Sequence, residues 1–449
     1  MKSGLKCKAH VAFILWSVAI VFCILFQGPC YAQDNRQAIT ISDGLKIATE
    51  NNRLIKISFH ERNISYEDTV IARSKLLPDV NASLSQTFYS NQPGSYIGSQ
   101  NAYTSEKSYP SYGITAHQTI FAFGANISRY EASRMTLDAK KLNIDLTKNL
   151  VALNFIISYF DILETEKMIK VAQKEVESLQ SHMGVAKNLF NEGVITKNDL
   201  LQAEVRLSDA RQKLITLKNM RAVNAARINN ILSRPPGSEI IVEDVPVNVV
   251  SAGELPTLEN AWTSAEKQRI ELSIIDRELK ATELEETVKK SDYFPKFFAE
   301  GGYNYAENRY QLHKDNWSLI LGLNVNILSG GSTKAEVSKV RYRKEQILEQ
   351  KRKLVDDIKL EVEKNYLDIR NALEKTQVVK DAVAQAEENL RINKIRYEEG
   401  IGTATDVLDA ITLLTTAETN YYRALYELRR AEAGFRYATG INLVSAYSH

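Results

Sequence analysis

Apolar side chains recur every seven residues along two long stretches of the chain. The clearer series lies between residues 333 and 399 and comprises Leu348, Val355, Val362, Ile369, Thr376, Val383, Leu390 and Tyr397. A second series keeps this spacing 207 positions earlier and comprises Phe155, Ile162, Ile169, Val176, Met183 and Phe190. Apolar residues spaced by seven form one seam of a helix that packs against other helices. Because 333–399 contains no proline or glycine, it predicts one helix of ~67 residues and ~100 Å.

Four shorter segments alternate apolar and polar residues, which predicts β-strands with one apolar face. The strongest is 317–327, and the same alternation occurs in segments 297–305, 112–120 and 80–88. The loops between paired strands are polar and rich in Tyr, Asn, Ser and Gly, so they suit an aqueous exterior. A soluble four-stranded sheet is the plain alternative. Strands of about ten residues with one apolar and one polar face are typical of a membrane barrel wall.

The chain repeats itself. The segment that begins at Thr40 and ends near Pro78 recurs 217 positions later. The turns recur 207 positions apart and pair Gly193, Thr196 and Asp199 with Gly400, Thr403 and Asp406. The difference of ten residues is expected in the loop region 81–112, because loops absorb changes of length at little cost.

Each repeat is predicted to contain a helix, two strands, a very long helix and a shorter helix. The first helix of each repeat should be one continuous element that ends before Pro78 or Pro295. The predicted organisation is a first repeat at 33–232, a linker or equatorial segment at 233–256, a second repeat at 257–440 and a tail at 441–449. A plain coiled coil is the simpler explanation of the seams, but a wall of helices fits the matched helix lengths better.

The N-terminus predicts a secretory signal peptide over residues 1–32. Three lysines precede an apolar run at 11–26, and a cleavage site with small residues ends at Ala32. A retained anchor is the alternative, although the run is short for a membrane span of ~20 residues. All the cysteines lie in this leader: Cys7, Cys23 and Cys30. The mature chain is therefore expected to form no disulfide, and its stability must come from packing and assembly.

Charge and motifs exclude several classes of function. Removal of the leader takes three of 57 basic residues and none of 55 acidic ones, so the mature chain has a formal charge of −1 and no basic footprint for nucleic acid. No phosphate-binding loop, zinc-protease motif or nucleophile elbow is present. We therefore expect no catalytic residue, metal site or cofactor. No other run approaches a membrane helix, so membrane insertion would use strands. Four strands are too few to close a barrel, so several chains would share one.

At this point the chain resembles the TolC family of outer-membrane factors, over about 40–442. The resemblance rests on the duplication and on the turns FNEGVITKNDLLQAEVRLSDA from Phe190 and YEEGIGTATDVLDAITLLTTA from Tyr397. It implies a mainly α fold with a small membrane β part: a homotrimer with a shared 12-stranded β-barrel, four strands per chain, and a helical tunnel. The barrel would contact lipid in the outer membrane of a Gram-negative bacterium, and the tunnel would lie in the periplasm.

The resemblance also implies a function. It indicates a passive exit duct of a tripartite efflux pump or a type I secretion system, which contacts a periplasmic adaptor and an inner-membrane pump and is not an enzyme. The alternative is a periplasmic coiled-coil scaffold or adaptor protein, which would not need two pairs of lipid-facing strands. The transported substrate is not encoded in a generic duct.

Individual roles are carried over position by position. Asp406 and Asp409 match an acidic gate ring, and Asp199 and Tyr397 match positions that hold the gate shut by hydrogen bonds. The plain alternatives are helix capping for Asp199 and seam packing for Tyr397. Gly402 replaces an arginine that some members use as a latch. Residues at the periplasmic tip, where an adaptor would dock, are Gly193, Val194, Thr196, Gly400, Ile401 and Thr403.

Overall fold

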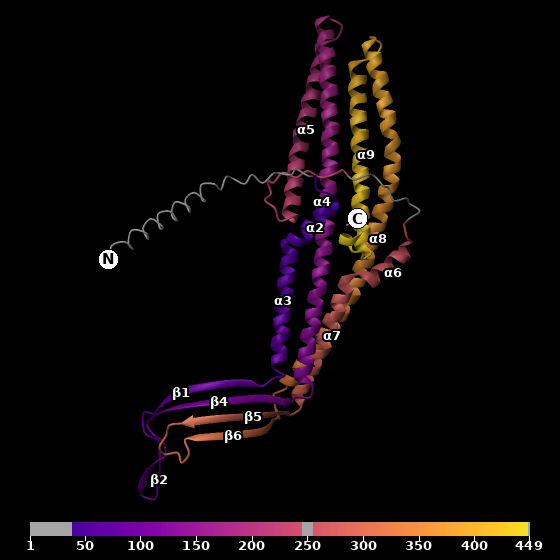
Figure 1. Ribbon diagram of the computed structural model, residues 1–449. Coiled ribbons are helices and arrows are strands. Elements are labelled where there is room, and N and C mark those ends of the chain that lie inside the picture. The colour runs from indigo at the N-terminus through magenta and orange to yellow at the C-terminus, as the bar shows by residue number, and fades with distance from the viewer. Residues whose placement is uncertain (1–37, 245–254, 448–449) are drawn as a thin grey trace, which may run out of the picture.

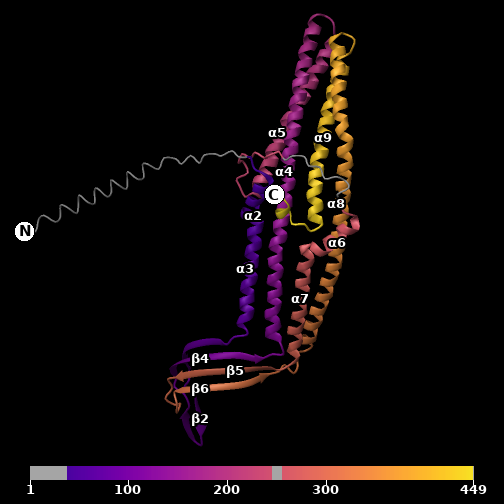
Figure 2. The same ribbon diagram turned by 45° about the vertical axis from the view of Figure 1, so that its right-hand side comes forward.

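The protein is an elongated rod of helices with a sheet projecting from one end (Figure 1). The computed structural model describes residues 38–244 and 255–447, so the predicted signal peptide lies outside the described residues. Two helical hairpins end at the opposite extremity of the rod, and both views agree on this arrangement (Figure 2). The sheet and the hairpin tips therefore lie at opposite ends of the molecule.

The helices occur as two matching sets. The first set is α2 (Ile41–Asn51), α3 (Arg53–Ser74), α4 (Ala125–Asn191) and α5 (Lys197–Ile231). The second set is α6 (Leu258–Gln268), α7 (Ile270–Lys290), the short 3-10 helix η2 (Ser291–Tyr293), α8 (Ser332–Glu398), α9 (Ala404–Ala438) and the terminal α10 (Leu443–Ala446). The starts of α2 and α6 are 217 residues apart, and those of α4 and α8 are 207 apart. The internal duplication is thus confirmed.

The first helix of each repeat is broken, which corrects the prediction of one continuous helix. Asn52 separates α2 from α3: its side chain accepts from the Leu54 N–H and donates to the Ile231 carbonyl at 2.8 Å. Arg269 separates α6 from α7 and is buried. Its guanidinium binds Glu271 at 2.7 Å and Glu361 at 2.8 Å. Tertiary contacts hold both breaks, although neither residue is a helix breaker by itself.

The strands form one antiparallel sheet in the order β1-β4-β5-β6. These strands are β1 (Asp79–Phe88), β4 (Ser108–Phe121), β5 (Lys296–Ala306) and β6 (Asp315–Asn324). The fourth strand therefore ends before Val325 and Ile327, which were predicted to belong to it. The β1–β4 loop contains an extra hairpin, β2 (Gly94–Ile97) and β3 (Gln100–Tyr103), where only a loop was predicted. This hairpin lies in the region expected to absorb the ten-residue difference between the repeats.

The sheet has one continuous apolar face. The register aligns Ala82 with Ile114, Ile114 with Tyr303, and Tyr303 with Trp317, so one row of apolar side chains crosses every strand. Its β6 members are among the most exposed large side chains of the described chain, with Leu319 75% and Leu321 73% exposed. Among the described residues, no helix covers either side of the sheet (Figures 1 and 2). Burial of this face, and pairing of the free edges of β1 and β6, therefore require something beyond the described part of the chain.

The main core lies midway along the rod, where α2, α4, α5 and α10 meet. Phe155 and Tyr159 of α4 are fully buried there, and the Phe155 ring lies under Gly44, where a Cβ would sit 2.0 Å from the ring. The helix α4 also contains a stretch that is long and apolar enough to cross a membrane by composition, contrary to the expectation that no such run exists. Because most of the stretch is buried, it is better explained as the core of the rod.

Candidate functional site

The two hairpin tips have the same backbone turn. Gly193 (φ 77°) and Gly400 (φ 73°) adopt left-handed conformations just after α4 and α8. In each turn the glycine N–H donates to the carbonyl three residues earlier, and the next N–H donates to the carbonyl five residues earlier. This closes the exposed end of the helix and needs a residue without a Cβ. The turns present Val194 and Ile401 to solvent, 66% and 71% exposed.

Capping boxes start the helices that follow. The Thr196 N–H donates to the Asp199 carboxylate at 3.0 Å, and the Thr403 N–H donates to the Asp406 carboxylate at 2.9 Å. Each threonine hydroxyl in turn accepts from the N–H of its aspartate. Hydrogen bonds from Thr403 hold the pKa of Asp406 below its ordinary value. Asp406 therefore stays ionised at low pH, and Asp409 lies exposed one turn further along α9.

Tyr397 is buried between the hairpins. Its ring lies 5.2 Å from that of His182 on α4, and its hydroxyl has no hydrogen-bond partner in the described chain. Burial and the charge of Asp199 raise the pKa of Tyr397, but no hydrogen bond joins these two side chains. Asp199 instead caps its own helix. The structure thus brings the two predicted gate residues near each other, and their role in holding a gate shut stays a prediction.

His182 is the tip residue that sequence reasoning missed. It is 6% exposed, and its Nε2 atom also lacks a partner among the described residues. Burial, and to a smaller extent the charge of Lys394 on α8, lower the pKa of His182. The only signal in the sequence is its position next to Met183 of the α4 seam. The contact of His182 with Tyr397 arises only because α8 lies beside α4 at this point, and the sequence pattern does not predict that arrangement.

Gly402 has a packing reason to be glycine. Its N–H donates to the Arg396 carbonyl at 2.9 Å, so the turn folds back tightly on the end of α8. A Cβ here would lie 3.1 Å from the Tyr397 nitrogen and 3.2 Å from the Arg396 carbonyl carbon. An arginine at this position would therefore need a small shift of the turn.

Ion pairs join the two hairpins below the tips. Arg430 of α9 binds Asp161 at 3.0 Å and Glu164 at 2.6 Å, both on α4. Nearer the tip, Lys174 of α4 binds Glu418 of α9 at 3.1 Å. The α4–α9 contact therefore extends from the core toward the tips and keeps the hairpins side by side.

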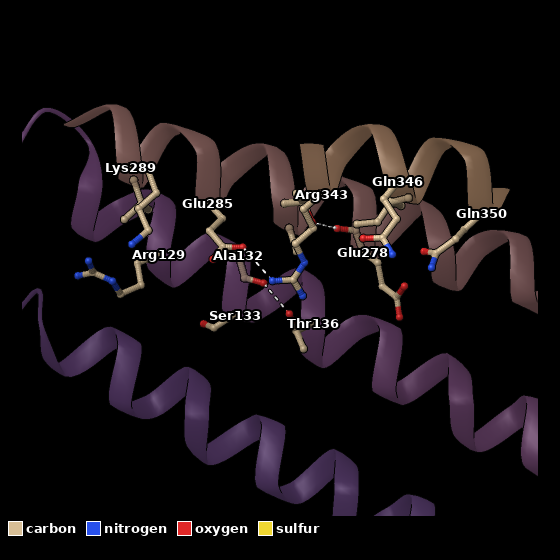
Figure 3. A pocket seen from close by; sticks show the side chains of 14 residues that line it. Arg129, Ala132, Ser133, Thr136, Glu278, Glu285, Lys289, Arg343, Gln346 and Gln350 are labelled. Atoms are coloured by element: carbon tan, nitrogen blue, oxygen red, sulfur yellow. Dashed lines mark hydrogen bonds and ion pairs between the residues drawn. The ribbon is translucent and has the colours of Figure 1, made fainter. Parts of the chain in front are cut away.

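A groove of about 730 Å³ lies at the other end of the rod, between α4, α7 and α8 (Figure 3). Figure 3 shows Arg343 of α8 and Glu285 of α7 directed toward each other, and their charged groups are 3.7 Å apart. Lys289 pairs with Glu336 at 3.2 Å. The groove contains none of the predicted site residues. Within residues 38–244 and 255–447, no three His, Cys, Asp or Glu side chains are placed to hold a metal ion.

These features together define a class of protein. An uncovered sheet with one apolar face suits a lipid bilayer, and long helical hairpins with capped tips suit a wall that leads away from it. The fold and the site are those of a subunit of a membrane-anchored duct.

Comparison with known proteins identifies the family. The outer membrane efflux protein family matches residues 44–234 and 263–441, so the chain belongs to this family. The chain is 23% identical over 388 residues to nodulation protein T of Rhizobium leguminosarum bv. trifolii, covering 84% of this chain and 80% of that protein. It is 21% identical over 427 residues to outer membrane protein TolC of Escherichia coli (strain K12), covering 90% and 83%. The solved outer-membrane channel OprN matches 90% of both chains with a TM-score of 0.79 and 16% identity.

The chain is therefore an outer-membrane channel subunit of the efflux and secretion type. It belongs in the outer membrane, with its helical part in the periplasm. The resemblance, the mainly helical fold and the localisation predicted from the sequence are confirmed.

Proposed function

We propose that three copies of this chain close into one β-barrel and one helical tunnel, which together form a passive exit duct. The observation that carries this proposal is the sheet: four strands, two free edges and an apolar face that no described residue outside the sheet covers. Free edges are not tolerated in lipid, so strands from other copies must pair with β1 and β6. Twelve strands from three copies make a closed barrel with a polar interior.

The tip is the proposed gate of the duct. Three copies would bring the Asp406 and Asp409 carboxylates into one ring that attracts cations and repels anions. Tyr397 and Asp199 would hold the closed tip by polar contacts. Replacing Gly402 by arginine is expected to lower the resting conductance, because it restores a side chain able to bind these carboxylates. Equal resting conductance of Gly402→Arg and the wild type would count against a latch at this position.

The exposed tip turns are the proposed docking surface for a periplasmic adaptor. Val194 and Ile401 are apolar and mostly exposed, which suits contact with a partner rather than with water. An inner-membrane pump bound through the adaptor would supply all the energy, and the chain itself would catalyse no reaction. The names of the two relatives, nodulation protein T and outer membrane protein TolC, do not say whether the cargo is a small molecule or a protein.

A periplasmic coiled-coil scaffold is the competing function. It would use the same helices, but it gives no reason for apolar side chains as exposed as those of Leu319 and Leu321. Water would surround them in a scaffold, whereas lipid tails would surround them in a barrel.

The experiment is to extract the mature protein from the outer-membrane fraction with detergent and to measure its native mass and its conductance in planar bilayers. A conducting trimer is the expected result. A species that is soluble without detergent, or a monomer or dimer, would eliminate the duct and favour the scaffold.

A further inference from the structure

The charged groove near the sheet has the features of a ligand site. This groove of about 730 Å³ between α4, α7 and α8 (Figure 3) lies beside the last turns of α7, shortly before the chain enters β5. Both of its walls come from one chain, because α7 packs against α4 and also against α8. Each copy in a ring would therefore contain a complete groove of its own.

The charges of the groove are unevenly distributed along it. Its three cationic and two acidic side chains are Arg129, Lys289, Arg343, Glu278 and Glu285. Arg129 and Lys289 lie at the same end, and Glu278 lies well away from them (Figure 3). Because Arg129 is in the second turn of α4 and Lys289 is in the last turn of α7, the cationic end is the end nearest the sheet.

The two cations at this end are available to an anion. Among the described residues, the Arg129 guanidinium donates only to a neutral group, the Asn126 Oδ1 atom at 3.2 Å. Lys289 pairs with Glu336 at 3.2 Å, but these side chains are 32% and 46% exposed, and an exposed ion pair contributes little free energy. A guanidinium and an ammonium that converge at one end of a groove are donors suited to a phosphate group.

A carboxylate lies one helical turn from these cations. Glu285 precedes Lys289 by four residues on the same face of α7, about 6 Å along the helix. Its one ion pair within the described chain is with Arg343 at 3.7 Å, which is longer than a direct hydrogen bond. Glu278 follows about two turns further from the sheet. These carboxylates repel a ligand that is only anionic, and they attract a ligand that carries an ammonium next to its phosphate.

We infer that the groove binds the headgroup of phosphatidylethanolamine, with its phosphate at Arg129 and Lys289 and its ammonium at Glu285. In this lipid the phosphate is joined to the acyl chains and the ammonium is two carbons further out, so the phosphate lies on the bilayer side. The groove has the same order, because its cationic end is nearest the sheet.

The surroundings of the cationic end also suit a lipid. Between α7 and β5 the chain passes through Tyr293 and Phe294, which are 52% and 48% exposed. Exposed aromatic side chains beside membrane strands are typical of the boundary between lipid and water. The inference rests on the proposed function, because a lipid headgroup reaches the groove only if the sheet lies in a bilayer.

Native mass spectrometry of the detergent-extracted protein measures the bound lipid. From an equal mixture of phosphatidylethanolamine and phosphatidylglycerol, the wild type is expected to retain phosphatidylethanolamine in preference. Arg129→Gln should lower this affinity by about tenfold, because a charge-assisted hydrogen bond to the phosphate is lost. Arg134→Gln is the matched control, since it changes an arginine of α4 that pairs with Glu131 outside the groove. Equal retention of phosphatidylethanolamine by these two variants would overturn the inference.

A change of lipid preference tests the ammonium position. Phosphatidylglycerol has the phosphate but no ammonium, so Glu285 should repel it. Glu285→Gln is expected to weaken the binding of phosphatidylethanolamine and to strengthen that of phosphatidylglycerol. If Glu285 only maintains the shape of the groove, its replacement should weaken both lipids alike, and that result would refute its role as the ammonium partner.

Soluble phosphoethanolamine separates the headgroup from its source. It is expected to displace phosphatidylethanolamine only at much higher concentration, because it lacks the acyl chains. Retention of phosphoethanolamine by a protein that does not retain the lipid would show that the bilayer does not supply the ligand. The native mass of the same sample reports the assembly, so absence of a trimer is a failure of the proposed function. A conducting trimer without a preference for phosphatidylethanolamine is a failure of this inference alone.

Discussion

The two longest helices show how the same repeat can have opposite surroundings. Both α4 and α8 contain 67 residues, begin after a left-handed glycine and end at a capped tip. Phe160 of α4 is 3% exposed, whereas its counterpart Leu367 on α8 is 53% exposed. Val171 and Val378 differ in the same way, 3% against 74%. An apolar residue at a repeated position therefore indicates that its surface will be covered. It does not indicate whether the covering residues belong to the same chain.

Charge substitutions at the Phe160 and Leu367 pair should have the largest and most divergent effects. Phe160→Glu places a carboxylate in the core beside Tyr426, whose ring is 6.3 Å away, and should cost about 4 kcal/mol or more. Leu367→Glu should leave the chain folded but prevent trimer formation. Circular dichroism measures the fold and native mass measures the assembly, with Leu367→Met as the control that keeps both. A trimer of Leu367→Glu would show that this face of α8 is not an interface.

A matched truncation compares the packing of the two seams. Ile162 and Ile369 are repeat counterparts and are both almost completely buried, but Ile162 lies in the main core and Ile369 in a small cluster with Ala372 and Leu428. Ile162→Ala should therefore cost ~4–5 kcal/mol and Ile369→Ala ~2–3 kcal/mol, because a small cluster relaxes more easily. Thermal unfolding in detergent measures the difference. Equal losses would show that the assembly encloses α8 as fully as the chain encloses α4.

The regular parts of the fold could be predicted because they repeat. Period seven identified the helix α8, the stretch without proline or glycine gave its ends to within one residue, and period two identified the four long strands. The breaks at Asn52 and Arg269 could not be predicted, since they depend on partners far away in the sequence, such as the Ile231 carbonyl and Glu361. The β2–β3 hairpin was missed because its residues are polar and short strands carry little periodicity.

Local backbone chemistry decides part of the tip, and that part can be read from the sequence. Positive φ at Gly193 and Gly400, and capping by Thr196 and Thr403, follow from residue types a few positions apart. The surroundings of Tyr397 depend instead on His182, which comes from the other hairpin. Contacts between hairpins, like contacts between chains, need the three-dimensional arrangement and are not encoded in any short pattern.

The contact between α4 and α8 at the tip should respond to pH through His182. Because burial lowers its pKa, the packed arrangement of the two hairpins favours neutral His182. As pH falls below the ordinary histidine value of about 6.5, separated hairpins bind the proton more readily and opening is favoured, by up to ~tenfold per chain at pH 5.5. The groups that act on this site are Lys394 and Tyr397 of α8, with Asp199 of α5 acting on Tyr397.

Resting conductance at pH 7.5 and 5.5 measures this response. The resting conductance of the wild type is expected to rise on acidification. The conductance of His182→Gln is expected to stay constant, because glutamine cannot take up the proton. His117→Gln, which changes an exposed histidine beside Glu300 on the sheet, is the control and should still respond. Asp406 remains ionised over this range, since Thr403 holds its pKa low. Identical responses of wild type and His182→Gln would remove His182 from the gate.

The smallest expected effect is that of removing the capping box at the start of α5 or of α9, which compares equivalent positions of the two repeats. Thr196→Ala and Thr403→Ala remove the same side-chain cap at the start of α5 and α9, and each should cost ~1 kcal/mol of local helix stability. The functional consequences should differ, because Thr403→Ala removes the hydroxyl that helps to hold the pKa of Asp406 low, while the backbone N–H of residue 403 still donates to this carboxylate. Amide hydrogen exchange in the first turn of each helix measures the stability. The pH at which cation selectivity is lost should rise only in Thr403→Ala, and a parallel rise in Thr196→Ala would show that Asp199 belongs to the same ring.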